Sequence, residues 1–155
     1  MHIDFDELEN FLRVANKNTY AHKNAPKAAS LRPASEDYHF EQGNLVYHDT
    51  YFGGWDFMGE EIVYKTQEPV WGMNYYGFIL KKDVSENEIY DLLREALMQE
   101  YGDILPVRGP KEYVTSNGKY QNMLAGKLDR FSGTEEIFLN GEFVYRCWYH
   151  GGFIQ

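Results

Sequence analysis

The sequence predicts an α+β fold in which a unit of one helix and three or four antiparallel strands occurs twice. Three observations support this prediction: two capped amphipathic segments, aromatic-rich alternating segments after each of them, and a pattern of motifs that returns after roughly 75 residues. The chain has 155 residues with 13 tyrosines, 10 phenylalanines and 3 tryptophans, and aromatic side chains favour pleated sheets. We therefore expect a single domain over 1–155, built from repeats at about 3–80 and 84–154 that pack with pseudo-two-fold symmetry.

The first predicted helix begins after Asp4. Asp4 is a candidate N-cap with Glu7 three residues later, the spacing of a capping box, and Ile3 and Leu8 stand at the two positions of a hydrophobic staple. The helix is expected to end near 16–18. The apolar residues of the segment have helical spacing and form one stripe: Phe5, Leu8, Phe11, Leu12 and Ala15.

The rest of the first half predicts four strands. A loop that contains two prolines runs to about Glu36. Turn signals then separate alternating segments at the glycine of 42–44, at the glycine pair 53–54 and at 67–69. The expected strands cover 38–41, 45–52, 57–65 and 70–80.

A basic run precedes these strands. No acid occurs between Asn10 and Ser35. This run either meets an anion or an acidic face of the same protein, or it forms a solvated loop. The five positive charges are Arg13, Lys17, Lys23, Lys27 and Arg32.

The second half repeats the signals of the first. Ser85 and Glu88 have the capping-box spacing, and Gly102 is a helix-stop signal. The staple and stripe positions are also apolar: Val84, Ile89, Leu92, Leu93, Ala96 and Leu97. After a loop with two prolines, the glutamate pair 135–136 falls on the pair 60–61, which indicates a duplicated unit.

Several motifs resemble a known family. The strings are DTYFGG, F.GEE and PVW.MNYYG, followed by RGP, FSG.EEI and VYR.WYHGGFI. They resemble a bacterial family that is known only as a domain of unknown function, and the resemblance runs from the first helix to Ile154. Some members of that family carry an N-terminal helix-turn-helix of the phage-repressor type, for which this chain, starting its first helix at Asp4, is expected to have no room. The resemblance implies no activity, ligand or catalytic residue.

Strand alternation separates two faces of the predicted sheet. One face is apolar or aromatic in both halves and reads as core: Trp71, Met73 and Tyr75, matched by Tyr145, Cys147 and Tyr149. The opposite face carries hydrogen-bonding groups, which a mostly apolar ligand pocket needs in small number. We predict a ligand site from this face together with Trp55 and Asp49 beside the glycine break; the alternative is that these side chains are core with locally satisfied polar tips. The five residues of this face are Asn74, Tyr76, Arg146, Trp148 and His150.

The acids offer an alternative chemistry. Glu60 and Glu135 are expected on the core side, where a carboxylate needs a partner. They either approach each other as an acid–base dyad, or cap a neighbouring loop or pair with an arginine such as Arg130. A hydrolase or isomerase that uses Asp49, Glu60 or His150 is the least favoured reading, and the catalytic residues stay unassigned.

Metal, cofactor and thiol chemistry are not predicted. The pair 48–49 with His150 has no recognised metal-ligand spacing, and no cofactor motif is present. Cys147 is the single cysteine and falls on the expected core face, where a thiol is usually inert.

Composition narrows the partners. The net charge of −9 argues against direct binding of nucleic acid, and no apolar run is long enough to span a membrane. The N-terminus does not resemble a secretory signal, so we expect a cytoplasmic protein. The favoured function is a non-enzymatic module that binds a small molecule or effector. The alternative is a protein-interaction or transcription-associated regulatory module, acting as a homodimer or with a regulatory protein partner.

Overall fold

The computed structural model describes residues 3–81, 83–100 and 105–155. Both predicted helices and all four predicted strands of the first half form within a few residues of their expected bounds. The elements are α1 (Phe5–Asn18), β1 (Glu36–Gln42), β2 (Leu45–Gly53), β3 (Asp56–Lys65), β4 (Glu68–Ile79), α2 (Glu86–Leu97), β5 (Glu112–Val114), β6 (Gly118–Lys127), β7 (Arg130–Leu139) and β8 (Glu142–Phe153).

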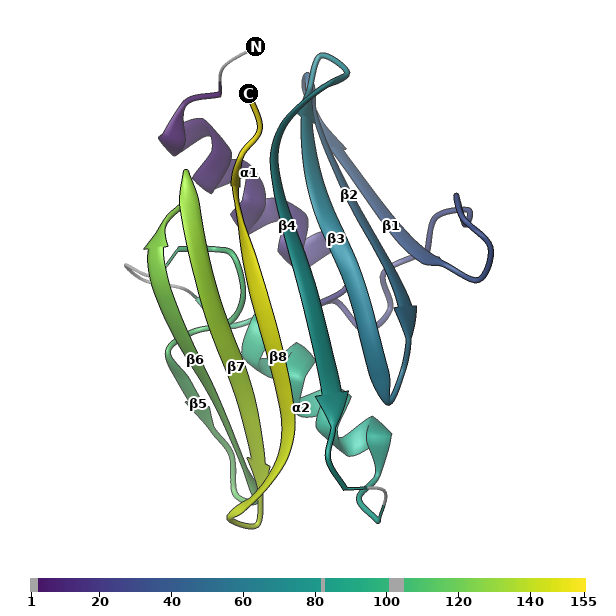
Figure 1. Cartoon of the computed structure of the whole chain (residues 1–155), viewed down its shortest axis with the longest axis vertical. Helices are drawn as coiled ribbons and strands as arrows, with labels where there is room; N and C mark the ends of the chain where they lie inside the picture. The colour runs from purple at the N-terminus through teal and green to yellow at the C-terminus, as the bar shows by residue number, and fades with distance from the viewer. Residues whose placement is uncertain (1–2, 82, 101–104) are drawn as a thin grey trace.

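The strands form one continuous antiparallel sheet (Figure 1). Its order is β1-β2-β3-β4-β8-β7-β6-β5, so each half of the chain builds one half of the sheet and the halves join where β4 pairs with β8. At this junction Tyr75 lies directly opposite Tyr149. The predicted α+β class and antiparallel pairing are confirmed.

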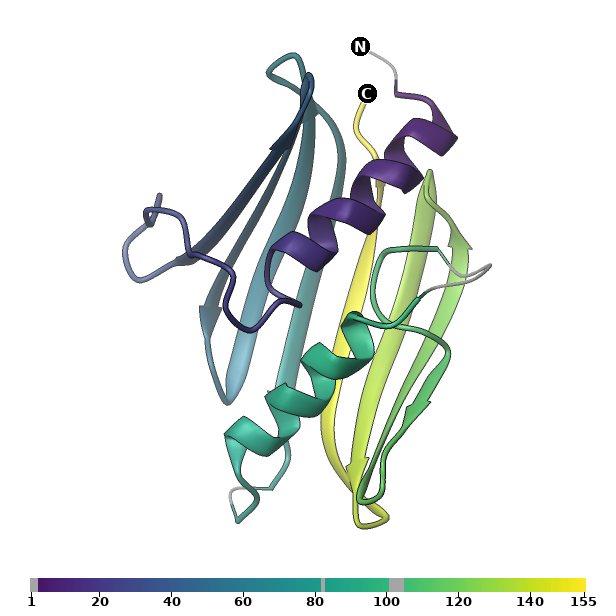
Figure 2. The same cartoon turned by 180° about the vertical axis from the view of Figure 1, so that it is seen from behind.

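Both helices cross the same face of the sheet (Figure 2). The N-cap prediction for α1 is confirmed, since Asp4 Oδ1 accepts from the backbone N–H groups of Asp6 and Glu7 at 2.9 and 3.4 Å. Ser85 occupies the N-cap position of α2 but its side chain makes no capping hydrogen bond, so the second capping box is not formed. The Glu88 carboxylate accepts instead from Asn117. The predicted stop at residue 102 lies outside the described residues.

The helices provide the cover that the sheet needs on that face. Their apolar stripes are buried as predicted except at Phe5, which is 41% exposed. Neither helix in the described part of the chain has the length and apolarity that a membrane crossing requires. The predicted core residues of β4 and β8 also lie on the helix side and are at most 9% exposed: Trp71, Met73, Tyr75, Tyr145, Cys147 and Tyr149.

The predicted position of Glu60 is wrong by one residue. Glu60 lies on the opposite, helix-free face and accepts from Arg32 at 2.9 Å, whereas its neighbour Glu61 points to the core and is 5% exposed. Glu61 lies opposite Met73 in the sheet, as Glu135 lies opposite Cys147. The register therefore matches Glu61, not Glu60, to Glu135. The core position of Glu135 itself is confirmed, since it is fully buried.

The basic run meets acids of the same chain. Each of its five cations forms an ion pair. The hypothesis that this run binds an external anion therefore has no unpaired basic patch to support it. The pairs are Arg13–Glu9, Lys17–Glu100, Lys23–Asp91, Lys27–Glu36 and Arg32–Glu60, with N···O distances of 2.5 to 2.9 Å.

Candidate functional site

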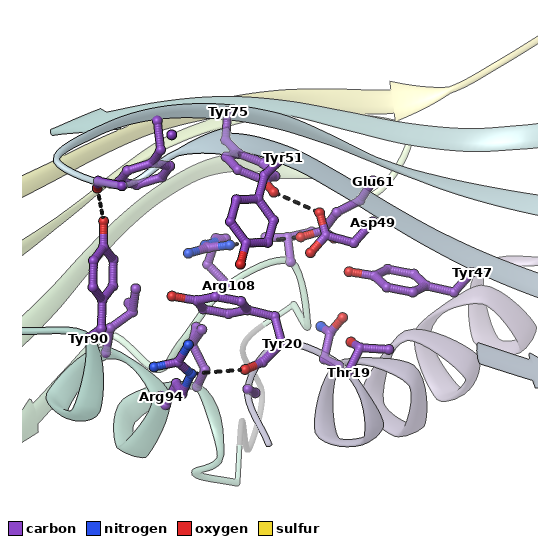
Figure 3. Close-up of a pocket in the computed structure, with 18 of the residues that line it drawn as sticks. Thr19, Tyr20, Tyr47, Asp49, Tyr51, Glu61, Tyr75, Tyr90, Arg94 and Arg108 are labelled. Carbon is purple, nitrogen blue, oxygen red and sulfur yellow. Dashed lines mark hydrogen bonds and ion pairs between the residues drawn. The ribbon is translucent and has the colours of Figure 1, made fainter. Parts of the chain in front are cut away.

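A cavity of about 240 Å³ lies between the helices and the first half of the sheet (Figure 3). Its floor is made by residues of β2, β3 and β4, and its cover by α2, the end of α1 and the segments that follow each helix. On the share of liquid volume that one water takes, the space corresponds to roughly eight water molecules. The polar and aromatic side chains that line it include Thr19, Tyr20, Tyr47, Asp49, Tyr51, Phe57, Glu61, Tyr75, Tyr90, Arg94 and Arg108.

Two carboxyl groups face each other on the floor of the cavity. Asp49 on β2 and Glu61 on β3 are directly opposite in register, which places their Cβ atoms roughly 5 Å apart on the same face. They are 3% and 5% exposed. Tyr75 of β4 donates its hydroxyl to Asp49 Oδ1 at 2.7 Å, and this bond fixes one end of the pair (Figure 3).

Burial makes both groups weaker acids. It raises the pKa of Asp49 to about 6, against the opposing hydrogen bond from Tyr75 and the charge of Arg108. Burial, and then the charge of Asp49, raise the pKa of Glu61 to about 8. At neutral pH, therefore, the pair holds about one proton between its two members.

Arg108, in the segment between α2 and β5, is the cation nearest to the pair. It is 7% exposed, and its guanidinium places Nη2 2.6 Å from Glu135 Oε1 but Nη1 3.8 Å from Glu61 Oε1. Arg108 is thus committed to Glu135. Among the buried side-chain atoms of the described residues, Glu61 Oε2 and Arg108 Nε have no hydrogen-bond partner. Buried polar atoms in proteins are nearly always paired, so these two atoms indicate a missing partner.

Aromatic side chains form the walls. Tyr20 packs edge-on against Tyr51 with ring centroids 5.9 Å apart, and Phe57 packs against Tyr90 at 6.2 Å. Tyr20 is itself held by Arg94, whose guanidinium lies 4.7 Å from the ring centroid and whose Nε donates to the Tyr20 carbonyl. In Figure 3 the Tyr20 ring lies between Tyr51 on the sheet and Arg94 in the helix layer. The cavity can therefore hold a flat or cationic group against these rings.

The residues predicted for the ligand site divide between the two faces of the sheet. Asp49 lines the cavity. Asn74 lies opposite His150, and Tyr76 opposite Trp148, on the helix-free face. Tyr76 and Trp148 are 47% and 46% exposed, so the alternative in which they belong to the core is wrong.

Two further predicted residues lie apart from the cavity. Arg146, on the helix-free face, donates to Glu136 through Nε and Nη2 at 2.9 and 2.5 Å. Trp55, beside the glycine break, is half-buried against the core and does not line the cavity. The sheet therefore separates Asp49 from the predicted residues of the helix-free face: Asn74, Tyr76, Arg146, Trp148 and His150.

The predicted acid–base set does not converge. Glu60 and His150 lie on the helix-free face, whereas Asp49 faces the helices. His48 is bonded to Asp37 at 2.8 Å. Within 3–81, 83–100 and 105–155, no group of three or more histidine, cysteine, aspartate or glutamate side chains is placed to hold a metal ion.

Thiol chemistry finds no support either. Burial raises the pKa of Cys147, and its sulfur lies in the core. The position of Cys147 on the core face is confirmed.

Sequence reasoning missed most of the cavity. Glu61 could have been found from its parity with the buried Val63 two residues later. Arg108 had no spacing signal, because it reaches Glu135 from an irregular segment. Tyr20 follows α1 and Tyr90 lies in α2, and the two line the same cavity only in the folded chain.

The comparisons with known proteins bear on this same region. No curated protein and no solved structure matches the chain. The pattern of one family, described as a domain of unknown function (DUF5680), matches residues 49–154. The match starts at Asp49 and includes Glu61, Tyr75 and Arg108. With more than half of its length covered, the chain belongs to the DUF5680 family.

Proposed function

We propose that this protein binds a small molecule in the cavity between the helices and the first half of the sheet, without catalysing its conversion. One observation carries the proposal: Glu61 lines a cavity of about 240 Å³, and its buried carboxylate oxygen Oε2 has no hydrogen-bond partner. Apolar walls with a few placed polar groups are typical of ligand sites. The ligand site proposed here is therefore on the helix-covered face of the sheet, whereas the sequence analysis placed it mainly on the opposite face.

The experiment is a thermal-shift screen of metabolites of all charge classes, followed by native mass spectrometry of any complex. Ala21 lines the cavity and is 4% exposed, so Ala21→Phe fills the space and is expected to abolish the shift. Ala29→Phe, at an exposed position outside the cavity, is the matched control and is expected to keep it. A screen in which no compound stabilises the wild-type protein would contradict the proposal.

The predicted residues on the helix-free face give a second location for the ligand. Trp148 and Tyr76 present exposed rings there, and Arg146 lies within 5.8 Å of the Trp148 ring centroid. A ligand shift that Trp148→Ala removes and Ala21→Phe leaves intact would place the site on this face instead.

We also infer that the chain is a single domain that arose by duplication of a unit covering about 3–80 and 84–154. The sheet order supports this, because it reads the same from either edge toward β4 and β8. Tyr75 and Tyr149 face each other at the centre, and a register shift interrupts β3 and β7 at matching places. An independent test is to express the two units separately and to measure whether they associate into one folded protein.

A further inference from the structure

The second half of the sheet contains a counterpart of the acid pair. Asn122 lies opposite Glu135 in register, as Asp49 lies opposite Glu61. Tyr149 donates to Asn122 Oδ1 at 2.6 Å, the same contact that Tyr75 makes with Asp49 at 2.7 Å. The two clusters therefore share a glutamate, a facing residue and a tyrosine that donates to it, and the facing residue is an amide in the second half and a carboxyl in the first.

The second cluster is occupied by a segment of the protein itself. Arg108 donates through Nη2 to Glu135 Oε1 at 2.6 Å, while Tyr120 and Tyr145 donate to the same carboxylate at 2.7 and 3.1 Å. The next residue, Gly109, gives its N–H to the Tyr120 hydroxyl, and its carbonyl accepts from Asn122. Glu135 is fully buried with its charge neutralised by a guanidinium.

The first cluster has the same frame without the occupant. Its counterpart of Glu135 is Glu61, whose Oε1 is 3.8 Å from Arg108 Nη1 and whose Oε2 has no partner. Its second position is a carboxyl, Asp49, where the filled cluster has the neutral Asn122. The first cluster therefore has one more acidic group than the filled cluster and no guanidinium bonded to it.

We propose, resting on the function proposed above, that the cavity binds a small organic cation with N–H donors, an amine, amidine or guanidine, held by Asp49 and Glu61. The guanidinium of Arg108 on Glu135 shows which chemistry this frame accepts. An ammonium or amidinium on Glu61 Oε2 supplies the missing partner, and charge-assisted bonds of this kind are the strong ones. The rings of Tyr20, Tyr51, Phe57 and Tyr90 line the rest of the cavity and attract a cation at their faces.

The charges that face the pair agree with this assignment. The carboxyls of Asp49, Glu61 and Glu135 share one guanidinium, that of Arg108, and the hydroxyls of Tyr47 and Tyr75 complete the surroundings. The raised pKa values mean that, without a bound cation, the buried acid pair reduces its negative charge by binding a proton. Arg94, the other arginine of the cavity wall, donates to the Tyr20 carbonyl and stacks on the Tyr20 ring.

The test compares three probes of one shape: benzamidinium, benzamide and benzoate, each measured by calorimetry and thermal shift at constant ionic strength. We expect benzamidinium to bind at least tenfold more tightly than either of the others. Methylguanidinium and butylammonium extend the cation series to smaller and narrower shapes. Asp49→Asn and Glu61→Gln are expected to reduce cation binding at least tenfold, whereas Glu60→Gln removes the same charge from the helix-free face and is expected to change it less than twofold.

Each outcome decides something. Tighter binding of the cations that depends on both acids of the pair supports the proposal. Binding of benzamide or benzoate in preference, lost in Ala21→Phe, overturns the cation assignment and leaves the binding function in place. Absence of binding by every cation and by every compound of the wider screen overturns both. Unfolding curves for each variant separate a lost site from a lost fold.

Discussion

Replacing Glu61 by glutamine is expected to stabilise the protein at alkaline pH. The pKa of Glu61 is raised in the native state, mainly by burial and then by the charge of Asp49. The native state therefore holds its proton to higher pH than the unfolded chain does. The stabilising contribution of the bound proton is complete below about pH 4.5 and is lost as the pH rises through about 8. A glutamine is neutral at every pH and does not undergo this loss.

The magnitude follows from the two pKa values. Glu61 titrates near 8 in the native state and near 4.5 in a free side chain, and each tenfold change in acidity corresponds to about 1.4 kcal/mol. Ionised Glu61 thus destabilises the native state by as much as about 5 kcal/mol above pH 8. We expect Glu61→Gln to approach this gain at pH 9 and to have nearly wild-type stability at pH 4.

The assay is urea unfolding of both proteins from pH 4 to pH 9, monitored by tryptophan fluorescence. The matched control is Glu60→Gln, whose surface ion pair with Arg32 contributes at most about 1 kcal/mol. If the stabilities of wild type and Glu61→Gln run parallel over this range, Glu61 does not carry a raised pKa and the described electrostatics of the cavity are wrong.

Three further predictions concern other parts of the account. Arg108→Met removes the cation from buried Glu135 and is expected to cost about 3 to 5 kcal/mol in the free energy of unfolding; the double variant with Glu135→Gln should recover part of this loss. Asp4→Ala is expected to cost about 1 kcal/mol because a side-chain cap is lost, whereas Ser85→Ala should cost less because no such bond is present, and thermal unfolding compares them. Binding of benzamidinium at pH 7 is expected to release close to one proton from Glu61, measured as a buffer-dependent calorimetric enthalpy; a buffer-independent enthalpy would contradict it.

Local patterns were sufficient to predict the elements of this fold. The cap at Asp4 and the glycine break at 53–54 each depend on only a few neighbouring residues, so a short stretch of sequence is enough to predict them. The continuous sheet was not predictable in the same way. It depends on the pairing of β4 with β8, which lie far apart in the sequence, and a one-residue slip in matching the halves placed Glu60 where Glu61 lies.

The candidate site was predicted only through Asp49. Strand alternation identified the core face correctly. The expectation that the ligand lies on the face with hydrogen-bonding groups then placed the site on the exposed side of the sheet. The cavity depends on partners that come together only in three dimensions. Arg108 approaches Glu135 from an irregular segment, and Tyr20 and Tyr90 reach the cavity from the helix layer.

The most direct measurement is a crystal structure of the protein grown with benzamidinium at neutral pH. We predict the amidinium within hydrogen-bond distance of Glu61 Oε2, with its ring against the aromatic wall that Tyr20 and Tyr51 form. A cavity that contains only water, or that is closed by these tyrosines while the cation lies elsewhere, would contradict the central claim that this pocket is the binding site.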